Sequence, residues 1–179
     1  MSSHSFRPVA RSDFPMLSGW LMQPHVSRWW ADDASPEGVE ADYGGNVDGT
    51  EPAEVFVAYR DGNVIGLVQR LKLDDYPEYL GEIGTVLPVP AGTWSIDFLI
   101  GDPAHTRRGW GTEMIRAFTE RLWVDHAPAR TLIVPVHVSN RASWRALERA
   151  GYRRAAAGLL EPDNPADHRN HYLYRIDRP

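Results

Sequence analysis

The sequence predicts a mixed α/β domain in which two helices connect strands of one central sheet. Residues 54–73 are rich in β-branched and aromatic side chains on both sides of a short polar turn, which predicts a β-hairpin. Residues 93–101 have a strong strand pattern, and an amphipathic helix over 111–123 follows after a loop. A short apolar strand over 130–136 precedes a second helix, which Gly151 ends.

The remaining segments have weaker patterns. Irregular structure is expected where Gly, Pro, Asn and Asp gather, namely in a loop over 44–52 and a long acidic excursion over 74–92. No linker or repeat divides the chain, so we expect one domain over residues 1–179 with helices on the faces of the sheet. The other expected elements are a strand over 5–9, a helix over 14–21, a short helix over 36–44 and a final strand over 171–176.

The composition limits the chemistry that the chain can perform. Hydrophobic residues make up 42% and charged residues 24% of the chain, as in an ordinary globular domain. No cysteine is present, which excludes disulfides and catalysis by a thiolate of the protein. The net charge of −5 favours a cationic small molecule over a nucleic acid as partner. His168 and His171 lack an acidic or cysteine companion, so we expect no metal site.

The sequence shows no targeting or membrane segment. The first residues have no signal-peptide pattern, and no apolar run approaches the roughly 18 residues of a membrane span. We therefore expect a cytoplasmic protein without a membrane partner.

The loop between the strand over 93–101 and the following helix is suited to bind an anion. It contains Gly109 and Gly111, and a helix starts there with free backbone N–H groups and a partial positive charge. Arg107 and Arg108 can add charge-assisted hydrogen bonds to phosphate oxygens. Neither the P-loop motif nor the dinucleotide fingerprint is present, and a lone Gly-x-Gly can equally be an ordinary turn.

A second motif distinguishes these alternatives, because the two together resemble the GNAT superfamily of N-acetyltransferases. In that family a strand, a glycine loop and a helix bind the pyrophosphate of acetyl-CoA, and a later Asn-led helix follows one strand further on. The first pattern matches Leu99, Ile100, Arg107, Arg108, Gly109, Trp110, Gly111 and Thr112, with Thr106 where an Arg or Gln is usual. The second matches Asn140, Ser143, Ala146, Leu147, Glu148, Gly151 and Tyr152.

The resemblance covers nearly the whole chain and carries definite implications. It implies a mostly antiparallel central sheet with flanking helices, acetyl-CoA as the cofactor, and a monomer or homodimer. It places the cofactor against Phe98, Leu99, Ile100, the 107–112 loop, Asn140 and Ser143.

Within the superfamily the chain is most similar to the aminoglycoside 6′-N-acetyltransferases, which are antibiotic-resistance enzymes. The similarity lies in the segments FRPV, HVSRWW, FVAYRDGNVIGLVQ and WSIDFLIG. It implies direct transfer of an acetyl group to the 6′-amine of an aminoglycoside. Asp97 falls where the family has an aspartate beside the reacting amine. Between Ile96 and Phe98 in an apolar strand, it needs a partner, a raised pKa or access to a cleft.

Two departures from the family concern catalysis and the substrate. Leu147 stands where a tyrosine often protonates the departing thiolate, and Tyr152 or Tyr172 is a possible replacement. Pro135 stands where some 6′-acetyltransferases have an aspartate, and the nearby His137 is not an equivalent anion.

Further substrate-binding candidates also have ordinary structural explanations. Trp29 and Trp30 can stack on a sugar ring or pack in the core. Acidic residues of the 74–92 excursion can form an anionic rim or a solvated loop; they are Asp74, Asp75, Glu78 and Glu82. Two alternatives to the aminoglycoside prediction stay open. One is acetylation of another amine, such as a polyamine, a siderophore precursor or a protein terminus. The other is a silent module that binds acyl-CoA without turnover.

Overall fold

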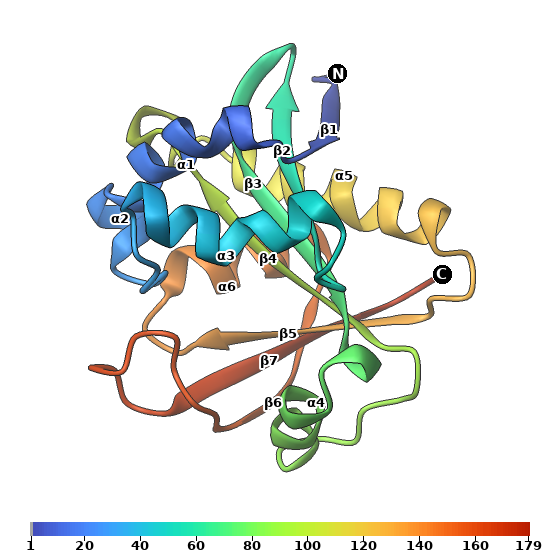
Figure 1. Ribbon diagram of the computed structural model, residues 1–179. Helices are drawn as coiled ribbons and strands as arrows, with labels where there is room; N and C mark the ends of the chain where they lie inside the picture. The colour runs from blue at the N-terminus through green and yellow to red at the C-terminus, as the bar shows by residue number, and fades with distance from the viewer. Residues whose placement is uncertain (1) are drawn as a thin grey trace.

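The computed structural model describes residues 2–179 as a seven-stranded sheet with helices on both faces (Figure 1). The strand order is β1-β2-β3-β4-β5-β7-β6, and every neighbouring pair is antiparallel except β4 and β5. The predicted mixed, mostly antiparallel sheet is therefore confirmed. The strands are β1 His4–Pro8, β2 Glu54–Arg60, β3 Asn63–Lys72, β4 Trp94–Ile100, β5 Thr131–His137, β6 Arg153–Leu159 and β7 Asn170–Asp177.

The helices form a layer on each face of the sheet. One layer packs through α5, whose Met114, Phe118 and Leu122 are fully buried against the apolar side chains of β2 to β5. The other covers β2 and β3 with Leu17 of α1 and Val39 of α3. The helices are α1 Phe14–Leu21, α2 Pro24–Ser27, α3 Pro36–Asp48, α4 Pro77–Gly84, α5 Trp110–Asp125 and α6 Arg141–Ala150. None of these helices, within residues 2–179, has the length and apolar character needed to cross a membrane.

The parallel neighbours β4 and β5 pair only where both strands begin. Trp94 is in register with Leu132, and no further paired position joins the two strands among the described residues. Beyond that point they diverge, as Figure 1 shows, while β4 stays paired with β3 and β5 with β7. The sheet is therefore open in its middle, between two strands that each remain firmly supported on the other side.

Two segments expected to be irregular contain helix. The prediction of a loop over 44–52 is wrong for its first part, because α3 continues to Asp48. Gly49, with φ at 71°, caps the helix. Burial of Val39 and Tyr43 and the Arg11 bridge to Glu40 and Asp48, both at 2.7 Å, outweigh the low helix propensity of the glycine pair.

The acidic excursion over 74–92 likewise contains α4. Pro77 provides a pre-set first turn, and Ile83 is fully buried against the sheet. Tertiary burial again decides the conformation of a segment whose glycines argued against a helix.

Candidate active site

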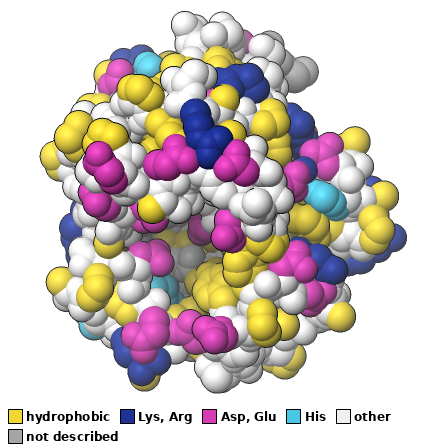
Figure 2. Space-filling model, in the orientation of Figure 1, with side chains coloured by type: hydrophobic (Ala, Val, Ile, Leu, Met, Phe, Trp, Pro, Cys, Tyr) yellow, Lys and Arg dark blue, Asp and Glu magenta, His cyan; other side chains and the backbone are white. Residues whose placement is uncertain are grey.

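A pocket of about 560 Å³ lies where β4 and β5 diverge. Its floor is formed by Asp97 and Phe98 of β4 and by Pro135 to His137 of β5. Figure 2 shows the hollow below α3, with acidic side chains around its rim. The open sheet thus creates a cleft that both flanking strands line with side chains.

Six carboxylates from four separate segments line this pocket. They are Asp32 before α3, Asp42 on α3, Asp97 on β4, and Glu161, Asp163 and Asp167 between β6 and β7. None of the lining side chains described in residues 2–179 is a lysine or arginine. The site is therefore strongly anionic, as a cationic ligand requires.

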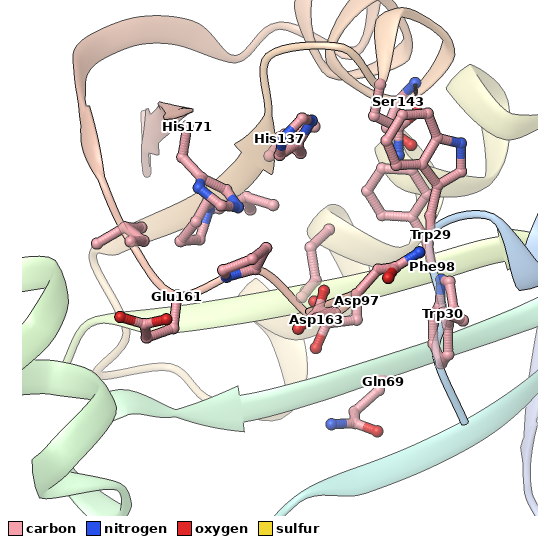
Figure 3. Close-up of a pocket in the computed structure, with 18 of the residues that line it drawn as sticks. Trp29, Trp30, Gln69, Asp97, Phe98, His137, Ser143, Glu161, Asp163 and His171 are labelled. Atoms are coloured by element: carbon pink, nitrogen blue, oxygen red, sulfur yellow. Dashed lines mark hydrogen bonds between the residues drawn. The ribbon is translucent and has the colours of Figure 1, made fainter. Parts of the chain in front are cut away.

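Asp97 is the carboxylate of this pocket whose pKa is raised to about neutral pH. Its strand neighbours Ile96 and Phe98 also pack on the core with α5, and Asp97 is half-buried in the lining of the pocket (Figure 3). Burial, followed by the negative charges of Asp163 and Asp32, raises the pKa of Asp97 to about 7. A carboxyl with this pKa can both accept a proton and bind an ammonium near neutral pH.

The segment between β6 and β7, residues 160–169, forms a strap over the mouth of the pocket. Arg28, just after α2, binds Asp167 of this strap through two hydrogen bonds of 2.7 Å. His137 of β5 donates to the carbonyl of His168 at 2.9 Å, and Glu82 of α4 accepts from the Glu161 N–H. The strap is thereby attached on both sides of the opening, which holds its carboxylates over the pocket.

Aromatic side chains also line the pocket. Trp29 and Trp30 both line the pocket, and the Trp29 ring lies 5.8 Å from the His137 ring. The Tyr43 hydroxyl donates to Asp32 at 2.9 Å, and burial raises the pKa of that phenol further. Both tryptophans therefore lie where the sequence placed them as candidates, beside the anionic site.

The acidic candidates of the 74–92 segment are arranged differently. Asp74, Asp75 and Glu78 do not line the pocket; Asp74 accepts from the Gly92 N–H and lies 3.3 Å from Lys72. Glu82 reaches the site indirectly, by positioning Glu161. Sequence analysis missed Asp32, Asp42 and the strap carboxylates, although the acidic run Glu161-Pro162-Asp163 between the last two strands was a readable signal.

The loop after β4 can hold a pyrophosphate. Gly109, with φ at 84°, precedes the first residue of α5, so the first-turn N–H groups have no helical partner. Arg107 and Arg108 are both exposed there, and Arg108 lies 5.7 Å from the Trp110 ring. Asn140 and Ser143 line the pocket at the start of α6, where the Asn140 side chain accepts from the Ser143 N–H. These donors suit an elongated phosphate-bearing ligand that runs from the loop into the pocket.

Neither tyrosine considered as a proton donor lines the pocket. Tyr152 is buried beneath α5, where its hydroxyl shares a 2.7 Å hydrogen bond with Thr119. The Arg154 guanidinium lies 3.9 Å from the centre of the Tyr172 ring, and Leu147 is fully buried. A thiolate of ordinary acidity is a competent leaving group, so the chemistry of acyl transfer does not by itself demand a proton donor at these positions.

Direct acyl transfer from an acyl-CoA to an amine needs amide donors for a pyrophosphate and a carboxyl that accepts a proton. In this fold β4 carries Asp97 and leads into the loop at the start of α5, where the amide donors lie. The sequence matches the acetyltransferase (GNAT) domain family over residues 9–159, and the chain belongs to this family. It is an acetyl-CoA-dependent N-acetyltransferase.

The most informative relatives are enzymes of one kind. Aminoglycoside N(6′)-acetyltransferases type 1 from Klebsiella pneumoniae and Serratia marcescens are each 28% identical over 167 residues, which is 92% of this chain and 80% of theirs. The crystal structure of aminoglycoside acetyltransferase AAC(6′)-Ib with coenzyme A has a TM-score of 0.81 at 23% identity, covering 98% of this chain and 95% of that one. The complex of that enzyme with coenzyme A and kanamycin has a TM-score of 0.79. These structures share the fold described above.

Proposed function

We propose that the enzyme acetylates a primary amine of a polycationic sugar, namely the 6′-amine of an aminoglycoside. The observation that carries this proposal is the lining of the pocket by carboxylates from four segments, with no lysine or arginine among the described lining residues. Several ammonium groups of one ligand can each face a carboxylate there, because the carboxylates come from four separate segments of the chain. The names of the curated relatives support the same substrate class.

Asp97 is the proposed proton acceptor. An alkylammonium is mostly protonated at neutral pH and must lose a proton before its nitrogen can attack a carbonyl carbon. Acetyl-CoA supplies the acetyl group as an activated thioester. Asp97 takes the proton from the amine and, as a carboxylate, holds the ammonium in place beforehand. The new bond joins the amine nitrogen to the acetyl carbon, and the sulfur leaves as a thiolate.

The cofactor is proposed to extend along the end of β4 and across the start of α5. The first-turn amides of α5 and the two loop arginines would bind its phosphates, because both present N–H donors to the same region. Asn140 and Ser143 would line its reactive end inside the pocket. The proposed cofactor residues are Phe98, Leu99, Ile100, Arg107, Arg108, Gly109, Trp110, Gly111, Thr112, Asn140 and Ser143.

Trp29 and Trp30 are proposed to pack against the sugar. Both residues line the pocket, and aromatic faces provide rigid, flat surfaces for the apolar faces of sugar rings. Asp163 and Glu161 would face ammonium groups on the remaining side.

The experiment is a thiol-release assay with acetyl-CoA and a panel of kanamycin A, spermidine and an N-terminal peptide amine. We expect turnover with kanamycin A. Asp97→Asn should lower its turnover by at least about tenfold while leaving acetyl-CoA affinity nearly unchanged. Asp75→Asn, which changes an exposed carboxylate outside the pocket, is the matched control. Turnover of spermidine or the peptide alone would overturn the substrate, and equal rates for Asp97→Asn and the control would overturn the role of Asp97.

A further inference from the structure

His171, the second residue of β7, faces the carboxylates of the pocket. It is paired across the strands with His137 of β5, only 7% of it is exposed, and it lines the pocket. Figure 3 shows the two histidines along one side of the pocket and Asp97, Asp163 and Glu161 along the other. The wall built by β5 and β7 therefore presents imidazoles rather than carboxylates.

The hydrogen bond at Nδ1 determines the state of the His171 ring. Nδ1 lies 2.9 Å from the carbonyl oxygen of Arg169, and a carbonyl oxygen can only accept, so Nδ1 carries a hydrogen. In the neutral ring the other nitrogen, Nε2, is then an acceptor. Within residues 2–179 no hydrogen bond reaches this Nε2, and the atom keeps some accessible surface on a residue that lines the pocket. It is a free acceptor on the wall of the pocket.

His137 lacks this freedom, although it lies beside His171. Its Nε2 donates to the carbonyl of His168 at 2.9 Å, and its Nδ1 accepts from the Ser139 N–H at 3.2 Å. Burial lowers the pKa of His137. A protonated ring would in addition lose the hydrogen bond from the Ser139 N–H. His137 is thus a fixed, neutral part of the wall, and His171 is the imidazole available to a ligand.

Asp163 couples His171 to the anionic side of the pocket. Burial raises the pKa of Asp163, and the positive charge of a protonated His171 ring would lower that pKa. A protonated His171 would therefore supply from within the protein the positive charge that a bound amine otherwise brings. The histidines and acids around the ring or across the pocket from it are His137, His168, Glu82 and the six lining carboxylates Asp32, Asp42, Asp97, Glu161, Asp163 and Asp167.

We propose that His171 determines specificity for the acceptor substrate: its neutral Nε2 accepts a hydrogen bond from an ammonium or hydroxyl group of the bound amine, and its protonated form excludes a cationic amine by pairing with Asp163. This assignment rests on the proposed function and names how the same pocket selects its ligand. On this wall the neutral ring presents an uncharged acceptor, whereas the opposite side of the pocket presents carboxylates. Amines that also carry hydroxyl groups are therefore preferred over amines whose polar groups are all charged ammonium groups.

The experiment compares steady-state kinetics of His171→Phe and His171→Gln with those of the unmodified enzyme. Its probe is whichever amine of the panel the unmodified enzyme acetylates, so that failure of the aminoglycoside assignment does not prevent the test. In His171→Phe, which keeps a ring without an acceptor, the amine KM should rise at least about tenfold, with kcat and the acetyl-CoA KM within about threefold. The amide of His171→Gln retains an acceptor and should recover most of this loss.

The pH dependence separates an acceptor from a merely structural ring. Lowering the pH should raise the amine KM more steeply in the unmodified enzyme than in His171→Gln, because an imidazole can take up a proton and a glutamine amide cannot. His168→Gln is the matched control, since that exposed ring lies 4.5 Å from the His137 ring and is not among the residues that line the pocket. An unchanged amine KM in His171→Phe, an equal effect in His168→Gln, or parallel pH profiles for the Gln variant and the unmodified enzyme would overturn the proposal.

Discussion

Arg28 and Asp167 are joined by two hydrogen bonds of 2.7 Å, one from each terminal nitrogen of the guanidinium. They are separated by 139 positions in the sequence, and the pair connects the turn after α2 to the strap over the pocket. The same guanidinium lies 4.3 Å from the Trp29 ring. One arginine thus orders both the strap and a tryptophan at the mouth of the pocket.

Removing this ion pair should weaken binding of the amine. In Arg28→Gln we expect the amine KM to rise about three- to tenfold, because a looser strap must be ordered when the substrate binds, while kcat changes little. The measurement is steady-state kinetics, with limited proteolysis of the strap as a second readout. Arg153→Gln, which removes an exposed arginine 3.5 Å from Asp177, is the control. Identical KM values for the two variants would show that the Arg28 pair does not hold the site.

The pH dependence of the reaction should report Asp97. A proton acceptor must be ionised, so kcat/KM for the amine should fall as the pH drops through about 7, where the pKa of Asp97 lies. The fall should be steepest below that value, because the protonated carboxyl neither accepts a proton nor attracts an ammonium. Residual activity of Asp97→Asn should lack this limb. A profile that stays flat between about pH 8 and about pH 5.5 would exclude Asp97 as the base.

The same carboxyl should limit the stability of the fold. In the unfolded chain Asp97 loses its proton near pH 4, whereas in the folded chain it keeps the proton up to about pH 7. The unfolded state therefore gains stability relative to the folded state as the pH rises between these values. At pH 8, Asp97→Asn should raise the Tm by at least about 2 °C. Near pH 4 the difference should largely vanish. A Tm below that of the unmodified protein at pH 8 would contradict this explanation.

Gly109 should be required for binding acetyl-CoA. Its φ of 84° is costly for a residue with a side chain, although an added Cβ would meet no atom within 4 Å. Gly109→Ala should therefore shift the turn that presents the first amides of α5 and raise the acetyl-CoA KM at least about fivefold, with a smaller effect on the amine KM. Gly92→Ala has comparable backbone strain at φ 75°, also with open space, and is the control. Equal acetyl-CoA KM values in both variants would reject a specific role for this turn.

Local sequence patterns were sufficient to predict the fold class and the part of the site that is contiguous in the chain. The hairpin over β2 and β3, the strand before the glycine loop and the two long helices follow periods of two and 3.6 residues, which depend on neighbours within a few positions. Asp97 was conspicuous for a local reason as well, since a carboxylate between two apolar residues of one strand is unusual. The same local reasoning failed for α4 and for the end of α3, where burial against distant residues outweighs glycine content.

Sequence patterns were thus enough to predict the family, the elements that carry its motifs and the unusual position of Asp97. The chain's three-dimensional arrangement sets which acids line the pocket: Asp163 shares it with Asp97 because the order β4-β5-β7-β6 brings the strap between β6 and β7 over the opening beside β4, and Asp32 joins them from the segment before α3. Asp74, Asp75 and Glu78, closer to Asp97 in the sequence, are directed elsewhere. The physical reason is that electrostatic interactions act through space, and the distances in space between these charges are set by strand pairings of residues far apart in the chain.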